Sequence, residues 1–180
     1  FAFDPAGGGP VTLVDDAPKD GSRPTGVNDG IAVNSATGQI FWTNMGRAAE
    51  RDGYIMRCEK DGSNVATIVA PGGTFTPKQL KIDEAAGKLY WSDREGMAIQ
   101  RCNLDGSHLE TIVTTGNAIT DKGDESRWCV GMAVDPAATV GTFNWYMAKV
   151  AVSLMVAGAP IVAIAAVGSF VELPEAANRL

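Results

Sequence analysis

The sequence has a single histidine and lacks the short motifs that usually mark an enzyme. It contains no GxSxG, no HExxH and no P-loop, which would indicate a nucleophilic serine, a catalytic zinc or a bound nucleotide phosphate. A Ser/His/Asp triad would have to use His108, and the neighbouring residues supply no evident supporting group. These absences favour a protein that is not an enzyme.

Basic residues and cysteines are also scarce. The chain has 15 Lys and Arg against 21 Asp and Glu, a net charge of -6, whereas nucleic-acid binding requires a basic patch that displaces counterions from phosphates. We therefore expect no nucleic-acid partner. Three cysteines are a poor disulfide framework because the count is odd, and without a CxxC motif or a Cys/His cluster a structural zinc site is not expected.

An internal repeat is the main feature that is present. Segments 54–69, YIMRCEKDGSNVATIV, and 98–113, AIQRCNLDGSHLETIV, match without gaps at nine of sixteen positions. Each is preceded by a second matching piece, which is GIAVNSATGQIFWTN at 30–44 and QLKIDEAAGKLYWSD at 79–93. Two complete units of the repeat therefore follow each other along the chain.

Partial units flank the two complete ones. A third copy begins as GMAVDP at 131–136 and reaches GTFNW at 141–145. At the other end VTLV, residues 11–14, resembles the ATIV and ETIV runs that close the complete units. The chain is therefore expected to open inside a repeat.

Each unit is expected to form four short antiparallel strands. Runs rich in β-branched and aromatic residues are bounded by Gly, Asn and Asp, and the DG pairs at 61–62 and 105–106 are strong hairpin signals. Four antiparallel strands in a repeat of roughly 40–50 residues are typical of a β-propeller blade. The sequence therefore predicts an all-β fold, a partial β-propeller of about three four-stranded blades.

Two repeated blocks resemble the signature of a known family. The IFWTN block at 40–44 and LYWSD at 89–93 are similar to the YWTD motif of low-density lipoprotein receptor class B repeats, and RCEKDGSN at 57–64 and RCNLDGSH at 101–108 resemble the second block of that family. The resemblance covers about residues 3–145. It implies a six-bladed propeller type, a role in binding other proteins, and no shared set of catalytic residues.

The recurring residues are interpreted as scaffold. The two tryptophans are expected to pack between neighbouring blades, since a buried Trp dominates local packing, and the DG residues are expected to form turns. The resemblance implies that the residue closing the YWTD-like strand hydrogen-bonds the backbone or a neighbouring blade, and the repeated arginines are expected to pair with a carboxylate at a blade junction. The structural set is Trp42, Asn44, Arg57, Asp61, Gly62, Trp91, Asp93, Arg101, Asp105 and Gly106.

Two of the cysteines, Cys58 and Cys102, also recur. Equivalent positions on neighbouring blades usually lie farther apart than the Cα separation of about 7 Å that a disulfide allows. Reduced thiols are therefore favoured over a bridge between them.

Partner binding is assigned to segments that do not repeat, because loops usually carry recognition while the scaffold positions them. The segment 45–53 is longer than its counterpart, and 115–128 and 16–30 are charged links between units. Solvated loop charges are the alternative interpretation. The candidates for contact with a protein ligand, or with another propeller-forming chain, are Arg47, Arg51, Lys122, Asp124, Glu125, Arg127 and Trp128.

Two other functional hypotheses stay open. The first is a divalent-metal-dependent lactonase or esterase, in which a central calcium polarises a lactone carbonyl and a carboxylate acts as base; otherwise no cofactor is expected. The second is a structural fragment without independent activity. The oxygen ligands that a metal could use are Asn28, Asn34, Asp83, Glu84, Asn117 and Asp135, and their spacing does not select this function.

The repeat pattern stops after Trp145, so residues 1–145 are assigned to propeller repeats and 146–180 to a separate apolar segment. Residues 150–171 contain no charge, and about 20 apolar residues suffice to cross a bilayer, although Pro160 interrupts the run. Three interpretations stay open. The segment is a membrane anchor, it is two buried strands or a helix packed on the propeller, or it is a non-native end.

Closure of the ring is a further expectation. About three blades are half of a six-bladed ring, and open sheet edges favour strand addition. The chain is therefore expected to be a fragment or to assemble with another copy. The resemblance favours a membrane-associated or extracellular location over the cytoplasm.

Overall fold

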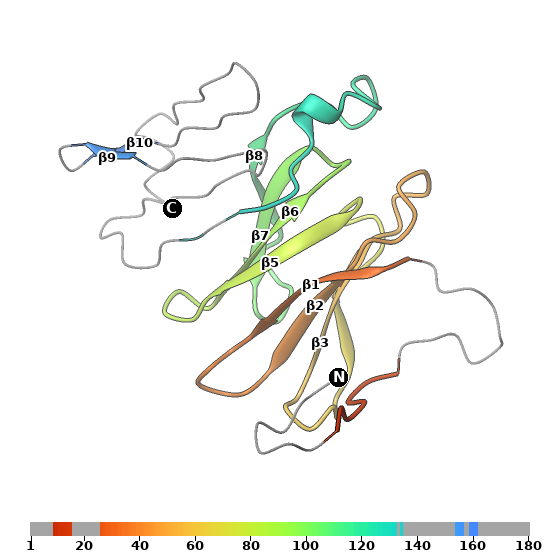
Figure 1. Ribbon diagram of the computed structural model, residues 1–180, viewed down its shortest axis with the longest axis vertical. Helices are drawn as coiled ribbons and strands as arrows, with labels where there is room; N and C mark the ends of the chain where they lie inside the picture. Colours follow the sequence, from red (N-terminus) through yellow and green to blue (C-terminus); the bar gives the residue numbers. More distant parts are fainter. Residues whose placement is uncertain (1–8, 16–25, 133, 135–153, 157–158, 162–180) are drawn as a thin grey trace.

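The computed structural model describes residues 9–15, 26–132, 134, 154–156 and 159–161. Within them the architecture is all-β, with two four-stranded antiparallel sheets stacked face to face (Figure 1). Sequential strands are neighbours in each sheet, which is the up-and-down order of a propeller blade.

The first sheet contains the strands of the first complete repeat, which are β1 (Asn28–Val33), β2 (Ile40–Asn44), β3 (Tyr54–Cys58) and β4 (Ala66–Val69). The second sheet contains those of the next repeat, which are β5 (Pro77–Asp83), β6 (Lys88–Asp93), β7 (Ala98–Asn103) and β8 (Glu110–Thr114). A short 3-10 helix, Glu125–Arg127, follows β8.

The two sheets share their irregularities as well as their order. The first two strands shift register between Asn28 and Ile31 in one sheet, and between Pro77 and Leu80 in the other. The last two strands shift again at equivalent positions of β3 and β7. Since a bulge re-aims the strand that follows it, the shared bulges indicate that both blades have the same twist.

The DG turns join the third and fourth strands of each sheet. Gly62 and Gly106 have φ of +83° and +88°, a conformation that glycine adopts at little cost. Asp61 accepts hydrogen bonds from the N–H and hydroxyl of Ser63, and Asp105 accepts the same pair from Ser107. These bonds close both turns in the same way.

The core between the sheets is formed by facing apolar side chains, and β1 and β5 lie side by side at this junction (Figure 1). Trp91 is completely buried here, and Trp42 is its counterpart on the outer face of the first sheet. Truncating a buried Trp usually costs about 3–5 kcal/mol. The buried members of this cluster are Phe41, Ile55, Val69, Leu80, Leu89, Trp91 and Cys102.

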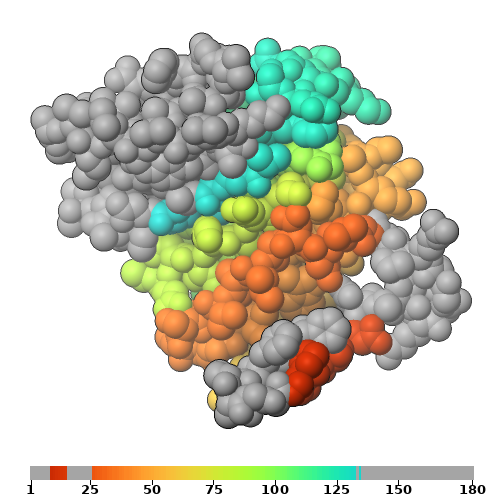
Figure 2. Space-filling model, in the orientation of Figure 1, coloured from red at the N-terminus to blue at the C-terminus, as the bar shows by residue number. Residues whose placement is uncertain are grey.

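A second cluster covers the other face of the second sheet. Tyr90, Ile99 and Val113 point away from Trp91, and Cys129 and Met132 pack on them from the segment after β8. Figure 2 shows this segment, in cyan, running alongside the green strands. Met132 belongs to the GMAVDP run, so the beginning of the third copy covers the second sheet as the second covers the first.

The N-terminal segment 9–15, in red in Figure 2, packs on the first sheet. A Cβ added to Gly62 would lie 2.3 Å from the carbonyl oxygen of Leu13, and a Cβ added to Gly106 would lie 2.1 Å from that of Ile68. Leu13 therefore contacts the DG turn of the first blade as Ile68 of β4 contacts the DG turn of the second. VTLV occupies the place of a fourth strand, as the repeat predicts.

The predicted all-β partial propeller is confirmed. Two of the predicted blades are complete in the described residues, whereas most of the third copy, 133 and 135–145, lies outside them, as does most of 146–180. Leu154–Val156 (β9) and Ala159–Ile161 (β10) pair as antiparallel strands rather than continuing one helix. Among the residues that the structure describes, no helix has the length and apolarity needed to cross a bilayer.

Candidate functional site

Antiparallel order places the loops of the blades on two opposite edges. The β1–β2 and β3–β4 turns lie at one edge, with their counterparts in the second sheet. The β2–β3 loops and the links after β4 and β8 lie at the other, where Figure 1 shows the orange and cyan loops. We call residues 45–53, 70–76, 94–97 and 115–128 the loop edge. All seven residues that the sequence nominates for partner contact lie on it.

The long β2–β3 loop, 45–53, is held by its own ion pair. The Arg47 guanidinium contacts Asp52 through Nε at 2.9 Å and Nη2 at 2.7 Å, and the Arg47 N–H also donates to this carboxylate. Burial raises the pKa of Asp52, but the bonds from Arg47 outweigh it and lower that pKa overall. The charge of Arg47 is therefore neutralised by a carboxylate of the same loop.

Arg51 is fixed differently. Its φ is +55°, which is uncommon for a residue other than glycine, and its carbonyl accepts a 3.2 Å bond from the N–H of Gly72. The guanidinium lies over the Phe75 ring, 3.9 Å from the centroid, and the N–H of Gly53 donates to the Phe75 carbonyl. Backbone hydrogen bonds thus join the β2–β3 loop to the link between the blades on both sides of this cation–π contact.

Arg51 and Phe75 line a cavity of about 260 Å³ at the loop edge. Its other walls come from the glycine-rich link at 72–74 and from strands of the second blade. Carboxylate, amide and hydroxyl groups face it. The remaining lining residues are Asp93, Gly96, Ala98, Gln100, Thr111 and Thr114.

The acidic group in this cavity is already saturated. Asp93 accepts bonds from the Thr74 hydroxyl and the Phe75 N–H at 2.7 Å, from the Thr76 N–H at 2.8 Å and from the Gly96 N–H at 3.1 Å. Asp93 thus fastens the inter-blade link to the end of β6. In the first blade the Asn44 side chain bonds Asn28 and the Gly46 N–H at the corresponding place, and no others among the described residues.

A second arginine–aromatic contact follows the second blade. The Arg94 guanidinium lies over the Trp128 ring at 4.9 Å. Unlike Arg51, it pairs with a carboxylate, that of Glu95, at 2.5 Å. Desolvation raises the pKa of Glu95, but hydrogen bonds from Arg94 and Thr76 lower it overall. The charge of Arg94 is therefore neutralised within the chain.

The loop 115–128 is closed by local bonds. Arg127 donates to Asp124 at 2.9 Å and to the Thr115 carbonyl at 2.9 Å, while Lys122 and Glu125 are exposed. Among the described residues, no backbone hydrogen bond joins this loop to 45–53. Phe75 and Arg94 lie on the same edge, and the sequence alone does not single them out because they do not stand out from their repeat units.

The predicted pairing of repeated arginines at a blade junction requires correction. Arg101 pairs with Glu110 at 2.5 Å, and the two residues face each other on β7 and β8 of one sheet. In the first sheet Arg57 faces Ala66 instead. The register, rather than a junction between blades, selects the partner.

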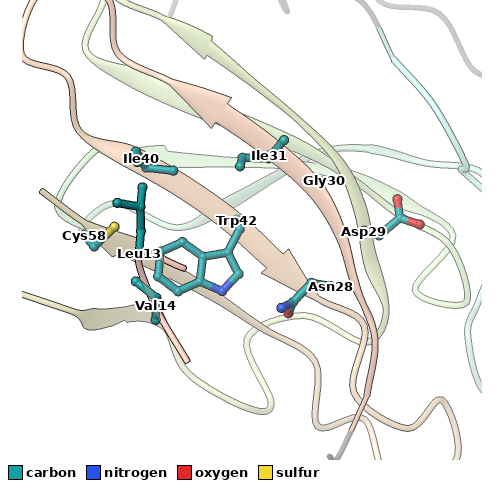
Figure 3. A pocket seen from close by; sticks show the side chains of 9 residues that line it. All are labelled: Leu13, Val14, Asn28, Asp29, Gly30, Ile31, Ile40, Trp42 and Cys58. Carbon is teal, nitrogen blue, oxygen red and sulfur yellow. The ribbon is translucent and has the colours of Figure 1, made fainter. Parts of the chain in front are cut away.

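A second candidate surface lies on the outer face of the first sheet, where a hollow of about 240 Å³ surrounds Trp42 (Figure 3). Leu13, Val14 and Cys58 lie beside the indole, and Asp29 points away from it (Figure 3). Further lining residues are Asn28, Gly30, Ile31 and Ile40.

Equivalent residues of the two blades differ in exposure at this face. Ile31 is 67% exposed, whereas Leu80, its counterpart in β5, is 2% exposed because the first blade covers it. Burying an Ile side chain stabilises by about 1.5–3 kcal/mol. The outer face of the first blade thus offers the same kind of surface that the second blade has already buried.

The described residues that a metal could use have hydrogen-bond partners within the chain. Oxygens of Asn34, Asp83 and Asn117 accept backbone N–H groups of their own turns, and Glu84 accepts the Ser35 hydroxyl at 2.7 Å. Asn28 accepts from Asn44, and Asp135 lies outside the described residues. Within the described part of the chain, no group of three or more His, Cys, Asp or Glu is placed to hold a metal ion.

Comparison with known proteins gives two sequence relatives, while no family model matches the chain. The low-density lipoprotein receptor-related protein 1 of Pyricularia oryzae is 48% identical over 112 residues, 59% of this chain and 36% of that protein. The 3-hydroxyacyl-CoA dehydrogenase-like protein LAM1 of Cochliobolus heterostrophus is 44% identical over 119 residues, 65% of this chain and 25% of that protein. The chain thus spans well under two thirds of either relative.

A solved structure shares the fold. A chain in the crystal structure of a nidogen/laminin complex superposes with a TM-score of 0.51 at 21% identity, over 68% of this chain and 40% of that chain. The strand order, the repeated YWTD-like blocks and the receptor-related relative agree with one another. Together they confirm that this chain resembles the YWTD-type propellers of the low-density lipoprotein receptor family.

Proposed function

We propose that the chain is a non-enzymatic module that binds a protein partner through its loop edge, in a membrane-associated or extracellular setting. The observation that carries the proposal is the ordered Arg51–Phe75 pair beside a 260 Å³ cavity. Arginine and aromatic residues held in place dominate the energetics of protein interfaces, since little entropy is lost when they bind. The similarity to a receptor-related protein supports the same conclusion.

Selection from a random peptide library on the immobilised chain tests this proposal. Peptides that bind should lose affinity when Lys122, an exposed residue of the loop edge, is changed to Glu. The matched control is Lys60→Glu, an equal charge reversal in the exposed β3–β4 turn at the opposite edge. Peptides that depend on Lys60 and ignore Lys122 would contradict binding at the loop edge.

The hydrolase alternative makes an opposite prediction. Binding by a non-enzymatic module persists after chelation with EDTA, and the chain hydrolyses no lactone with or without calcium. Calcium-dependent lactone hydrolysis that chelation abolishes would establish the alternative, because a Lewis-acid mechanism requires the ion.

A second candidate function is assembly with another propeller-forming chain, which the exposure of Ile31 favours. The natural occupant of the face around Trp42 is the inner face of another blade, since Leu80, Leu89 and Trp91 receive such a face within this chain. Sedimentation should detect self-association, and Ile31→Asp should abolish it. Ile119→Asp is the matched control, because Ile119 is 71% exposed on the loop edge. A monomer at all concentrations would exclude assembly between copies.

A further inference from the structure

Arg51, which lines the loop-edge cavity, has a positive charge that no described carboxylate neutralises. Arg47 pairs with Asp52, Arg94 with Glu95 and Arg101 with Glu110. Arg51 has no carboxylate partner among the described residues, although it is held in place by its backbone and by Phe75. Arg47 and Arg94, which share the loop edge with Arg51, thus have their charges neutralised, whereas the charge of Arg51 is not neutralised by a described carboxylate.

The contact with Phe75 leaves the recognition surface of Arg51 open. Stacking occupies one face of the guanidinium plane, whereas its N–H donors point outward in that plane and fit the two oxygens of a carboxylate. A φ of +55° is unfavourable for a residue other than glycine, so other contacts must hold Arg51 in it. The Gly72 N–H bond to the Arg51 carbonyl maintains this conformation, which directs the side chain over Phe75 at the cavity rim.

The other polar groups of the cavity are paired within the chain. Asp93 has four donors. Gln100 accepts from the Trp91 indole N–H at 3.1 Å and donates to the Gly73 carbonyl at 3.2 Å. The donors to Asp93 are uncharged and leave its negative charge in place. The lining group that can donate hydrogen bonds to a ligand is therefore the Arg51 guanidinium.

We infer that this cavity receives the carboxylate side chain of an aspartate or glutamate from the partner protein, with Arg51 as its ligand. The inference rests on the proposed function and names the chemistry that the loop edge recognises. The two oxygens of a carboxylate match the paired N–H donors of one guanidinium. A phosphate group carries nearly two negative charges, so Asp93, which also lines the cavity, would repel it more strongly than it repels a single carboxylate.

Because the chain as a whole is negatively charged, recognition of a carboxylate must depend on charges close to the cavity. A net charge of -6 does not attract acidic partners from a distance, but charges farther apart than about 8 Å are largely screened at physiological salt. The fixed Arg51 acts inside that distance. Affinity for an acidic peptide should therefore depend on Arg51 far more than on the sum of the surface charge.

Nuclear magnetic resonance with two blocked tripeptides, Gly-Asp-Gly and Gly-Asn-Gly, tests this inference. The Asp peptide should produce a saturable shift of the Arg51 side-chain Nε–H resonance. The Asn peptide, which has the same shape without the charge, should bind at least about tenfold more weakly, since charge-assisted bonds are about twice as strong as neutral ones. Inorganic phosphate, the third probe, should bind more weakly than the Asp peptide.

Arg51→Asn is the variant of choice, because asparagine tolerates positive φ and keeps the loop folded while removing the charge. It should abolish the shifts of the remaining cavity resonances. Arg57→Asn is the matched control, since Arg57 lies in β3 outside the loop edge and faces Ala66, and it should leave them unchanged. Amide resonances report that each variant is folded.

Four outcomes would overturn the inference. They are equal affinity for the Asp and Asn peptides, binding that survives Arg51→Asn, tighter binding of phosphate than of the Asp peptide, and no binding by either peptide. None of these outcomes decides the proposed function, because the library selection tests it with Lys122 and does not require an acidic ligand. Failure of the inference and failure of the proposed function are therefore distinguishable.

Discussion

The Asp93 carboxylate accepts a 2.7 Å hydrogen bond from the hydroxyl of Thr74, and this bond ties the inter-blade link to the last residue of β6. Asp93 closes the YWTD-like block of the second blade and is 2% exposed. Three backbone N–H groups share the same carboxylate. The side chain therefore organises the corner at which one blade passes into the next.

Asp93→Ala should destabilise the chain by about 3–5 kcal/mol, because it leaves several buried donors without an acceptor. Asn44→Ala, the same position in the first blade, should cost only about 1–2 kcal/mol, since Asn44 satisfies a single N–H group and one side chain. Chemical denaturation of both variants measures the difference. Equal losses would contradict the role assigned to Asp93.

Alanine substitutions at the two turn glycines should have different effects, because the two glycines contact different segments of the chain. Gly106→Ala brings a Cβ against the Ile68 carbonyl in β4, a paired strand, so the whole chain should lose stability. Gly62→Ala meets Leu13, which lies in the short segment 9–15 and can move away. Limited proteolysis should then cut within 9–15 faster in Gly62→Ala than in Gly106→Ala, whereas the thermal midpoint should fall further in Gly106→Ala.

The ion pair between Arg101 on β7 and Glu110 on β8 can be rebuilt in the first sheet. Arg57 faces Ala66 where Arg101 faces Glu110. Ala66→Glu should supply the missing carboxylate and stabilise the chain by about 0.2–1 kcal/mol, the range of partly exposed pairs. Ala66→Gln is the control, because it has similar size without charge. A gain that is as large for Gln as for Glu would show that packing, not pairing, is responsible.

The sequence repeat predicts the fold well because the scaffold is periodic. The spacing of Trp42 and Trp91, and of the DG turns at 61–62 and 105–106, places strands and blade faces without further information. Even the likeness of VTLV to ATIV is sufficient to place Leu13 against Gly62. Each of these features depends on local residue type and on a repeat that imposes its own register.

The candidate site is less accessible from sequence because it depends on contacts between segments that do not repeat. Arg51 is identified as a loop residue, but its contact with Phe75 joins a loop of the first blade to the link before the second. Arg47 and Arg127 are equally good candidates by sequence. Only their pairing with Asp52 and Asp124 reveals that these charges are used inside the chain.

The three cysteines provide a prediction that depends on pH. All three are free and buried, as expected for reduced thiols, and burial raises the pKa of Cys102 and of Cys129 to about 12. The reactive thiolate is therefore rare in the folded chain at pH 8, so iodoacetamide should label no more than a trace of either residue. In guanidinium all three cysteines should react, because their pKa returns to about 8.5.

The same shift makes folding sensitive to alkali. The folded state holds the thiol protons more tightly than the unfolded state does, so the stabilisation is complete below about pH 8.5 and declines as the pH rises toward the folded pKa. Denaturation midpoints measured from pH 7 to pH 11 should therefore fall, and Cys102→Ala should fall less steeply than the unsubstituted chain. Rapid labelling of Cys102 or Cys129 at pH 8 in the folded chain would show that these thiols are not enclosed by the blade cores.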